Sequence, residues 1–143
     1  MFDCRMDVGA LFYQFDVTVR HVVDLQIAAV QRLLRPGAPF LIGMHKTFND
    51  KLMLFTAADA KSKDAGRFLF APEKGGQYEA WFARPMAAAL QDYCAVDVKY
   101  FFAAAQKLAP SDLALRNCAT LSLKRVTRVT TERVENCSAE RDF

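Results

Sequence analysis

The stretch PMAAALQDYCAVDVKYFFAAAQKL, residues 85–108, decides the predicted fold of this chain. Pro85 suits the first turn of a helix, the interior is rich in alanine, and Pro110 follows shortly after the end. These features predict one helix from Pro85 to Leu108. Within it Tyr93 and Asp97 are four residues apart, so their side chains project from one face about a turn from each other.

Apolar residues flank this tyrosine and aspartate on the same side of the predicted helix, namely Leu90, Cys94 and Phe101. A carboxylate among apolar neighbours is costly unless a metal, a cation or hydrogen bonds compensate it. This makes Asp97 a candidate functional residue. On spacing alone the alternative is favoured, in which the face is only partly buried, Asp97 reaches water and Tyr93 is an amphipathic core residue.

The rest of the chain carries weaker patterns of secondary structure. Residues 6–15 place apolar side chains at helical spacing, and the β-branched residues through Val23 predict a buried strand that gives way to a helix near Gln26. RPGAP at 35–39 ends that element. We expect helix within 40–70, a loop at 72–78, and another helix or strand in the basic C-terminal third.

Composition is ordinary for one globular domain, with 143 residues of which 52% are hydrophobic and 24% charged. No apolar stretch reaches the roughly 18 residues that a membrane span requires, and the N-terminus does not resemble a signal peptide. The cysteines are Cys4, Cys94, Cys118 and Cys137. Because they form no CxxC pair, we expect neither a zinc site nor a disulfide framework, and an intracellular setting is favoured.

Basic residues gather near the C-terminal end of the chain, although the net charge of +3 is modest. Arg116, Lys124, Arg125, Arg128 and Arg133 are opposed between residues 116 and 133 only by Glu132. Such an excess could meet the phosphates of a nucleic acid, with Lys124, Arg125 and Arg128 as the candidate contacts. A solvated basic face is the more common explanation of such a cluster.

Two motifs resemble those of the DEDDy-type 3′ to 5′ exonucleases, the ribonuclease D-like proteins. DYCAVDVKYF at 92–101 is similar to the family's third motif, in which tyrosine and aspartate are separated by three residues on a helix, and YEAWFARPM at 78–86 resembles the sequence before that helix. FDCRMDVGALFYQFDVTVRHVVDLQIA at 2–28 resembles the second motif, with Asp7 opening a helix and Asp24 on the following strand. The resemblance covers about residues 2 to 108.

The resemblance implies a helix-rich α/β fold of the ribonuclease H-like type, incomplete at its N-terminus. It divides the chain into an exonuclease-like domain at 1–110 and a basic C-terminal extension at 111–143. It also implies that Asp7 and Asp97 help to hold two Mg²⁺ or Mn²⁺ ions and that Tyr93 orients or activates the attacking water. Two such ions can stabilise the entering and leaving oxygens of a phosphodiester.

The chain departs from this family because the first motif, a strand bearing Asp-x-Glu, has no counterpart in it. Three functions therefore stay open. The first is a 3′ to 5′ exonuclease-like domain that acts on ends of single-stranded RNA or DNA. The second is a non-catalytic nucleic-acid-binding adaptor. The third is a structural subunit of a ribonucleoprotein complex, in which a partner protein or a missing N-terminal segment completes the sheet.

Overall fold

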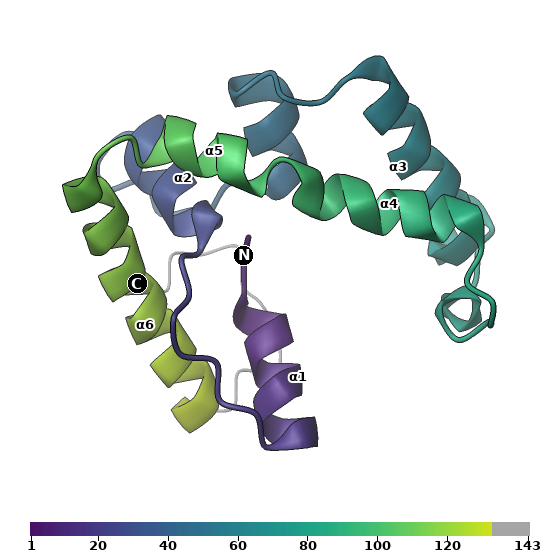
Figure 1. The fold of residues 1–143 in the computed structure, drawn as a ribbon, viewed down its shortest axis with the longest axis horizontal. Helices are drawn as coiled ribbons and strands as arrows, with labels where there is room; N and C mark the ends of the chain where they lie inside the picture. The colour runs from purple at the N-terminus through teal and green to yellow at the C-terminus, as the bar shows by residue number, and fades with distance from the viewer. Residues whose placement is uncertain (133–143) are drawn as a thin grey trace. The chain divides into compact units, whose positions relative to one another are not determined.

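The computed structural model describes residues 1–132, and this part of the chain folds into helices and loops without a β-strand (Figure 1). The expected α/β ribonuclease H-like fold is therefore wrong, and the chain is of the all-α class. The helices fall into two compact units, which are described one at a time. Unit 1 combines residues 1–52 with the chain from residue 101 onward, and unit 2 comprises residues 53–100.

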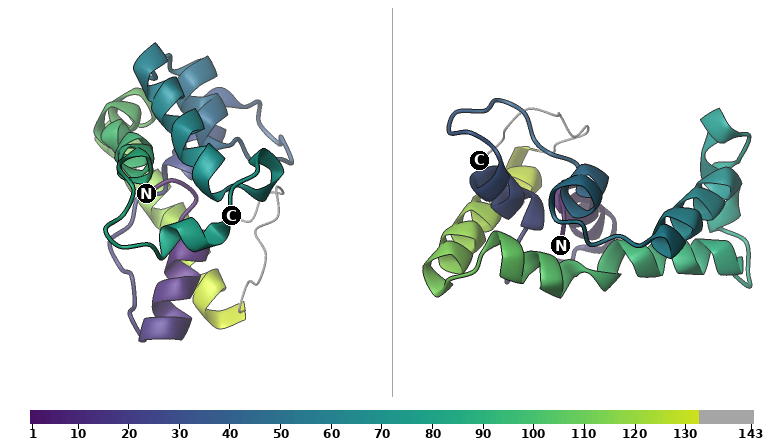
Figure 2. Two further views of the ribbon diagram at one scale, coloured as in Figure 1. Left: turned by 90° about the vertical axis from the view of Figure 1, so that its right-hand side faces the viewer. Right: turned by 90° about the horizontal axis from the view of Figure 1, so that it is seen from above.

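Unit 1 is assembled from two separate parts of the chain (Figure 2). Its first part holds α1 (Arg5–Phe15), α2 (Leu25–Leu33) and the short π-helix η1 (Lys46–Lys51), and its second part holds α5 (Phe101–Leu108) and α6 (Asp112–Glu132). The long helix α6 packs against both α1 and α2, and α2 also packs against α5. The boundary expected at residue 110 lies inside unit 1, between α5 and α6.

An apolar cluster fills the space between α1 and α6. Its buried members are Cys4, Val8, Val22, Val126 and Val129. Val8 and the two α6 valines lie on the inward stripes of their helices, so a continuous apolar seam joins the two elements. The predicted helix at 6–15 is confirmed by α1.

The segment predicted as a strand is an irregular stretch that ends where α2 begins. A strand needs a neighbour to pair its backbone groups, and none exists among residues 1–132. Val22 is buried because it joins the apolar cluster of unit 1, so a β-branched stretch can be sequestered without forming a sheet. Asp24 does not lie on a strand, because it is the N-cap of α2 and its side chain accepts a hydrogen bond from the Gln26 amide.

Unit 2 is a pair of packed helices joined by two short 3₁₀ turns. The helices are α3 (Ala57–Phe70) and α4 (Ala88–Lys99), and the turns are η2 (Pro72–Lys74) and η3 (Tyr78–Trp81). A capping box opens α3: the Thr56 hydroxyl accepts from the Asp59 amide, and the Asp59 carboxylate accepts from the Thr56 amide. The rings of Phe70, Trp81 and Tyr93 pack on one another where the turns meet the two helices.

The single helix predicted from Pro85 to Leu108 is two helices. The first begins at Ala88 and ends at Lys99, Tyr100 adopts a non-helical conformation, and α5 starts at Phe101. Elsewhere the helix expected near Gln26 is present as α2, the C-terminal third forms the helix α6, and the helix expected within 40–70 is confined mainly to α3. The loop expected at 72–78 includes η2.

Candidate functional site

The tyrosine and aspartate of the predicted catalytic pair both contact Lys63, a residue of α3. The Lys63 ammonium lies 3.5 Å from the centroid of the Tyr93 ring and forms an ion pair with a carboxylate oxygen of Asp97. Lys63 is only 7% exposed, whereas the Asp97 side chain keeps 27% of its surface. A cation of the chain itself therefore compensates Asp97, and the ring face of Tyr93 adds a cation–π contact.

Close packing of α3 on α4 brings Lys63 to this position. A Cβ atom added at Gly66 would lie 2.6 Å from the Cβ of Tyr93 and 2.9 Å from its Cγ. Since only glycine leaves room for so close an approach, Gly66 sets the spacing of the two helices where the tyrosine lies. Tyr93 thus contacts α3 through both Gly66 and Lys63, as a packing residue does.

A second polar contact joins the first turn of α3 to the C-terminal end of α4. The buried carboxylate of Asp59 accepts hydrogen bonds from Lys99 Nζ at 2.9 Å and from the Tyr100 hydroxyl at 2.6 Å. Burial would raise the pKa of Asp59, but the hydrogen bonds from Thr56, Tyr100 and Lys99 outweigh it, and the pKa falls well below its usual range. The sequence pattern Thr-x-x-Asp at 56–59 could have indicated this cap.

The predicted metal site draws its residues from both units. Asp7 is exposed in the first turn of α1 in unit 1, whereas Tyr93 and Asp97 belong to unit 2. Within residues 1–132 no group of three or more histidine, cysteine, aspartate or glutamate side chains is arranged to hold a metal ion. The metal role of Asp7 and Asp97 and the catalytic role of Tyr93 stay predictions.

A buried ion pair between Asp24 and Arg125 lies at the centre of unit 1. Arg125 Nη1 is 2.7 Å from Asp24 Oδ2 and 2.9 Å from Gln26 Oε1, and neither charged side chain is exposed. The Asp24 carboxylate also accepts from the backbone amides of Asp3 and Cys4. Arg125 therefore faces the interior, and the sequence-based expectation that it contacts nucleic acid is corrected on this ground.

This network determines the ionisation of Asp24. Burial by itself would raise the pKa of Asp24, but the guanidinium of Arg125 and the amides of Cys4 and Gln26 favour the charged form, so the pKa lies below its ordinary value. In contrast, burial raises the pKa of the Cys4 thiol, and the neighbouring Asp24 charge raises it further. Cys4 and Cys118 are buried free thiols and Cys94 is an exposed one, while Cys137 lies outside the described residues.

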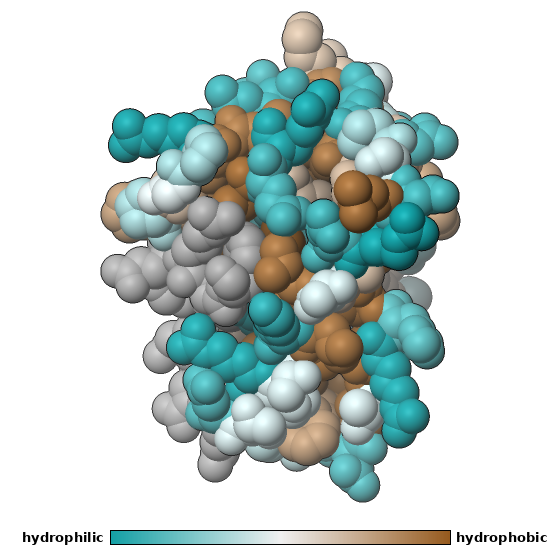
Figure 3. All heavy atoms as spheres, turned by 90° about the vertical axis from the view of Figure 1, so that its left-hand side faces the viewer, coloured by the Kyte–Doolittle hydropathy of each residue, from teal (hydrophilic) through white to brown (hydrophobic). Residues whose placement is uncertain are grey.

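The outer face of α6 carries the other basic residues of the predicted cluster. Arg116, Lys124 and Arg128 are all exposed. Arg128 forms an ion pair with Glu132 at 2.7 Å, one turn further along, whereas Arg116 and Lys124 have no ion-pair partner in the described part of the chain. Arg133 lies outside that part. Figure 3 shows hydrophilic side chains interspersed with apolar ones on the side of the molecule where α6 lies in Figure 1.

Two shallow hollows run along this outer face. One, of about 340 Å³, lies between residues 20–23 and α6 and is lined by Arg20, His21, Val22, Val23, Ala119, Thr120 and Leu123. The other, of about 550 Å³, is lined by Thr120, Leu123, Lys124, Thr127, Arg128, Thr131 and Glu132. They share Thr120 and Leu123, so they are adjacent. Arg20 thus joins the basic face from a distant part of the sequence, and no periodic pattern indicated it.

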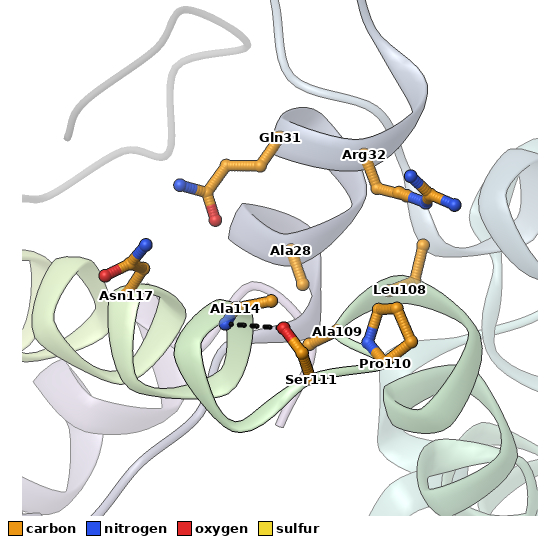
Figure 4. Close-up of a pocket in the computed structure, with 9 residues that line it drawn as sticks. All are labelled: Ala28, Gln31, Arg32, Leu108, Ala109, Pro110, Ser111, Ala114 and Asn117. Carbon is orange, nitrogen blue, oxygen red and sulfur yellow. Dashed lines mark hydrogen bonds between the residues drawn. The ribbon is translucent and has the colours of Figure 1, made fainter.

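A third hollow, of about 330 Å³, lies where α2 meets the junction of α5 and α6 (Figure 4). Ala28, Leu108 and Pro110 contribute apolar surface, and the side chains of Gln31 and Asn117 lie at one side. The Ser111 hydroxyl accepts a hydrogen bond from the Ala114 amide at 3.2 Å and so caps α6. The hydroxyl is therefore engaged in the helix cap.

The chain was compared with known proteins in three ways. No protein-family model matches it, and neither a curated protein nor a solved structure was found to be similar. No helix within residues 1–132 is both long and apolar enough to cross a bilayer.

Proposed function

We propose that this chain is a non-catalytic nucleic-acid-binding adaptor that contacts phosphates through the outer face of α6. The observation that carries the proposal is the buried pair of Asp24 and Arg125. An arginine held inside unit 1 fixes the rotation of α6 about its axis, and this rotation leaves Lys124 and Arg128 in solvent. Arg116, two turns before Lys124, and Arg20 extend the same cationic face.

Phosphate binding needs cations that are exposed and available. Lys124 and Arg116 are exposed and have no ion-pair partner among residues 1–132, so a phosphate would not displace a carboxylate of this part of the chain from them. Arg128 shares its charge with Glu132, but both side chains are at least half exposed, so this pair is easily exchanged. Contacts of this kind release counterions and make the affinity depend on salt.

The contacts of the predicted catalytic residues support an adaptor more than a nuclease. Lys63 already neutralises Asp97 and covers the ring of Tyr93. For Asp97 to bind a divalent cation, the nearly buried Lys63 ammonium would have to leave or stay beside the metal, and either is unfavourable. The 3′ to 5′ exonuclease activity implied by the family resemblance is the competing hypothesis.

The proposal is tested by measuring binding of a labelled oligonucleotide across a series of salt concentrations. Lys124→Ala and Arg128→Ala are each expected to weaken binding and to flatten the plot of log affinity against log salt by about one charge. Lys61→Ala is the matched control, because Lys61 is exposed on α3 in unit 2 and its loss changes the net charge equally. Equal weakening by all three variants would contradict the proposal, because binding would then depend on the net charge of the chain and not on the outer face of α6.

A further inference from the structure

We infer that the hollow between residues 20–23 and α6 is a nucleobase subsite, and that the adaptor therefore prefers single-stranded to duplex nucleic acid. This inference rests on the proposed function and names the form of nucleic acid that the basic face takes. It is carried by the lining of the hollow, in which apolar side chains, an exposed aromatic ring and a cation come together.

His21 is placed to stack on a base. The amide of Val22 donates to the carbonyl of Arg20 at 3.0 Å, which makes a tight turn with His21 at its centre. The imidazole is exposed and lines the hollow. Histidine rings are among the side chains on which unstacked bases pack in nucleic-acid complexes.

Most residues that line the hollow are apolar, and one of them, Arg20, is a cation. Val22, Val23 and Ala119 contribute apolar surface, and Leu123 is exposed to 53% between this hollow and the adjacent one. A base that leaves water gains by covering such a surface, as it does on the stacking surfaces of proteins that bind single strands. The same base could not reach this surface while paired and stacked within a duplex.

Cations line this hollow and the adjacent one. Arg20 lines the hollow itself, and Lys124 and Arg128 line the adjacent hollow beyond Leu123. Lys124 and Arg128 are four residues apart on α6, so their stems rise about 6 Å from one to the next along the helix axis. A strand whose backbone follows these cations can turn one base inward toward His21.

The inference is tested with the full chain, an oligothymidylate strand, and the same strand annealed to oligoadenylate. We expect the single strand to bind more tightly than the duplex. His21→Ala should weaken binding of the single strand roughly tenfold, the effect typical of losing one stacking contact, and should leave duplex binding unchanged. His21→Phe should retain most of the affinity, because phenylalanine keeps a flat ring.

Controls separate this inference from the proposed function. Lys124→Ala should weaken binding of both forms, because it removes a phosphate contact that single strand and duplex share. The base subsite is overturned if the duplex binds as tightly as the single strand. It is also overturned if His21→Ala changes the affinity for neither form, or changes the affinity for both forms equally. Phosphate binding by the outer face of α6 would stand in either case. If neither form binds, the proposed function fails and the inference fails with it. Circular dichroism of each variant should show that its helices are intact.

Discussion

Arg125 of α6 and Asp24, the N-cap of α2, form an ion pair of 2.7 Å between two side chains that are both fully buried. The pair connects residues 101 positions apart in the sequence. The Asp24 carboxylate also accepts hydrogen bonds from the backbone amides of Asp3 and Cys4, which precede α1. The backbone amide of Asp24 donates to the Ser122 hydroxyl of α6 at 2.8 Å. One carboxylate thus connects α6, the start of α2 and the chain that enters α1.

Removing the cation of this pair should destabilise unit 1 strongly. In Arg125→Met the Asp24 carboxylate stays buried without its counter-charge, and the expected loss is about 3–5 kcal/mol in the free energy of unfolding. Urea denaturation followed by circular dichroism measures it. Lys124→Met is the matched control, since the exposed neighbour should change the free energy by less than about 0.5 kcal/mol. A similar effect of both substitutions would contradict the buried pair.

Acid should destabilise unit 1 through the same carboxylate. The folded state holds the pKa of Asp24 below its ordinary value, so the unfolded chain binds more protons in the acid range. The stabilisation is complete above the unfolded pKa of about 3.9 and is lost as the pH falls through the lower, folded pKa. We expect Asp24→Asn to be less stable at neutral pH and to lose less stability on acidification. Denaturation midpoints measured across the acid range test this.

Gly66→Ala should push α3 and α4 apart. Its methyl group would overlap Tyr93 at the base of the side chain, which cannot swing away without moving α4. Overpacking of this kind costs about 1–3 kcal/mol, which exceeds the gain of up to about 1 kcal/mol that alanine brings to a helix. Gly43→Ala is the control, because the added methyl group meets no atom within 4 Å. Thermal denaturation should show a lower midpoint for Gly66→Ala alone.

The competing nuclease hypothesis has a direct test. In the presence of Mg²⁺ or Mn²⁺, we expect the chain to bind a strand labelled at its 5′ end without shortening it. The reason is that the Asp97 carboxylate is already paired with the Lys63 ammonium. Gel electrophoresis of the strand over time measures this. The opposite outcome is stepwise shortening from the 3′ end that is abolished by Asp97→Asn and unchanged by Lys61→Ala. This outcome would support the exonuclease hypothesis and refute the adaptor hypothesis.

Loss of Asp97 should have a structural effect whichever function holds. Asp97→Asn leaves the nearly buried Lys63 ammonium without its anion, so unit 2 should become less stable. Lys63→Met with Asp97→Asn should recover part of the loss, because the double variant buries no unpaired cation. A double-mutant cycle in urea denaturation measures the coupling between the two side chains. Additive effects of the two substitutions would contradict the ion pair.

Local sequence patterns predicted helices better than they predicted where those helices end. The alanine-rich stretch after Pro85 is helical on both sides of Tyr100, but the interruption there coincides with a hydrogen bond from the Tyr100 hydroxyl to Asp59, a residue 41 positions away. No local propensity encodes such a contact. The strand predicted up to Val23 is wrong, because β-branched residues indicate burial and do not by themselves supply a partner strand.

The basic cluster shows a similar limit. The buried positions of α6 are Cys118, Ser122, Arg125, Val126 and Val129, which follow helical spacing. A search for apolar periodicity misses this stripe because Ser122 and Arg125 are polar. The sequence therefore predicted a basic surface near Lys124 and could not separate the arginine that faces Asp24 from the lysine that faces solvent. The contact of Lys63 with Tyr93 and Asp97 was also missed, because nothing local pairs α3 with α4.

The division of unit 1 into two parts of the chain has a consequence for synthesis on the ribosome. Residues 53–100 are contiguous, so α3 and α4 can pair as soon as both have emerged. α1 and α2 emerge earlier, but their partners α5 and α6 come only after the whole of unit 2. Until α6 has emerged, Asp24 cannot form its ion pair with Arg125, and Val8 cannot pack against Val126 and Val129. Unit 2 is therefore expected to fold first. Unit 1 can fold only after α6 has been synthesised, and its folding closes a loop that contains the whole of unit 2.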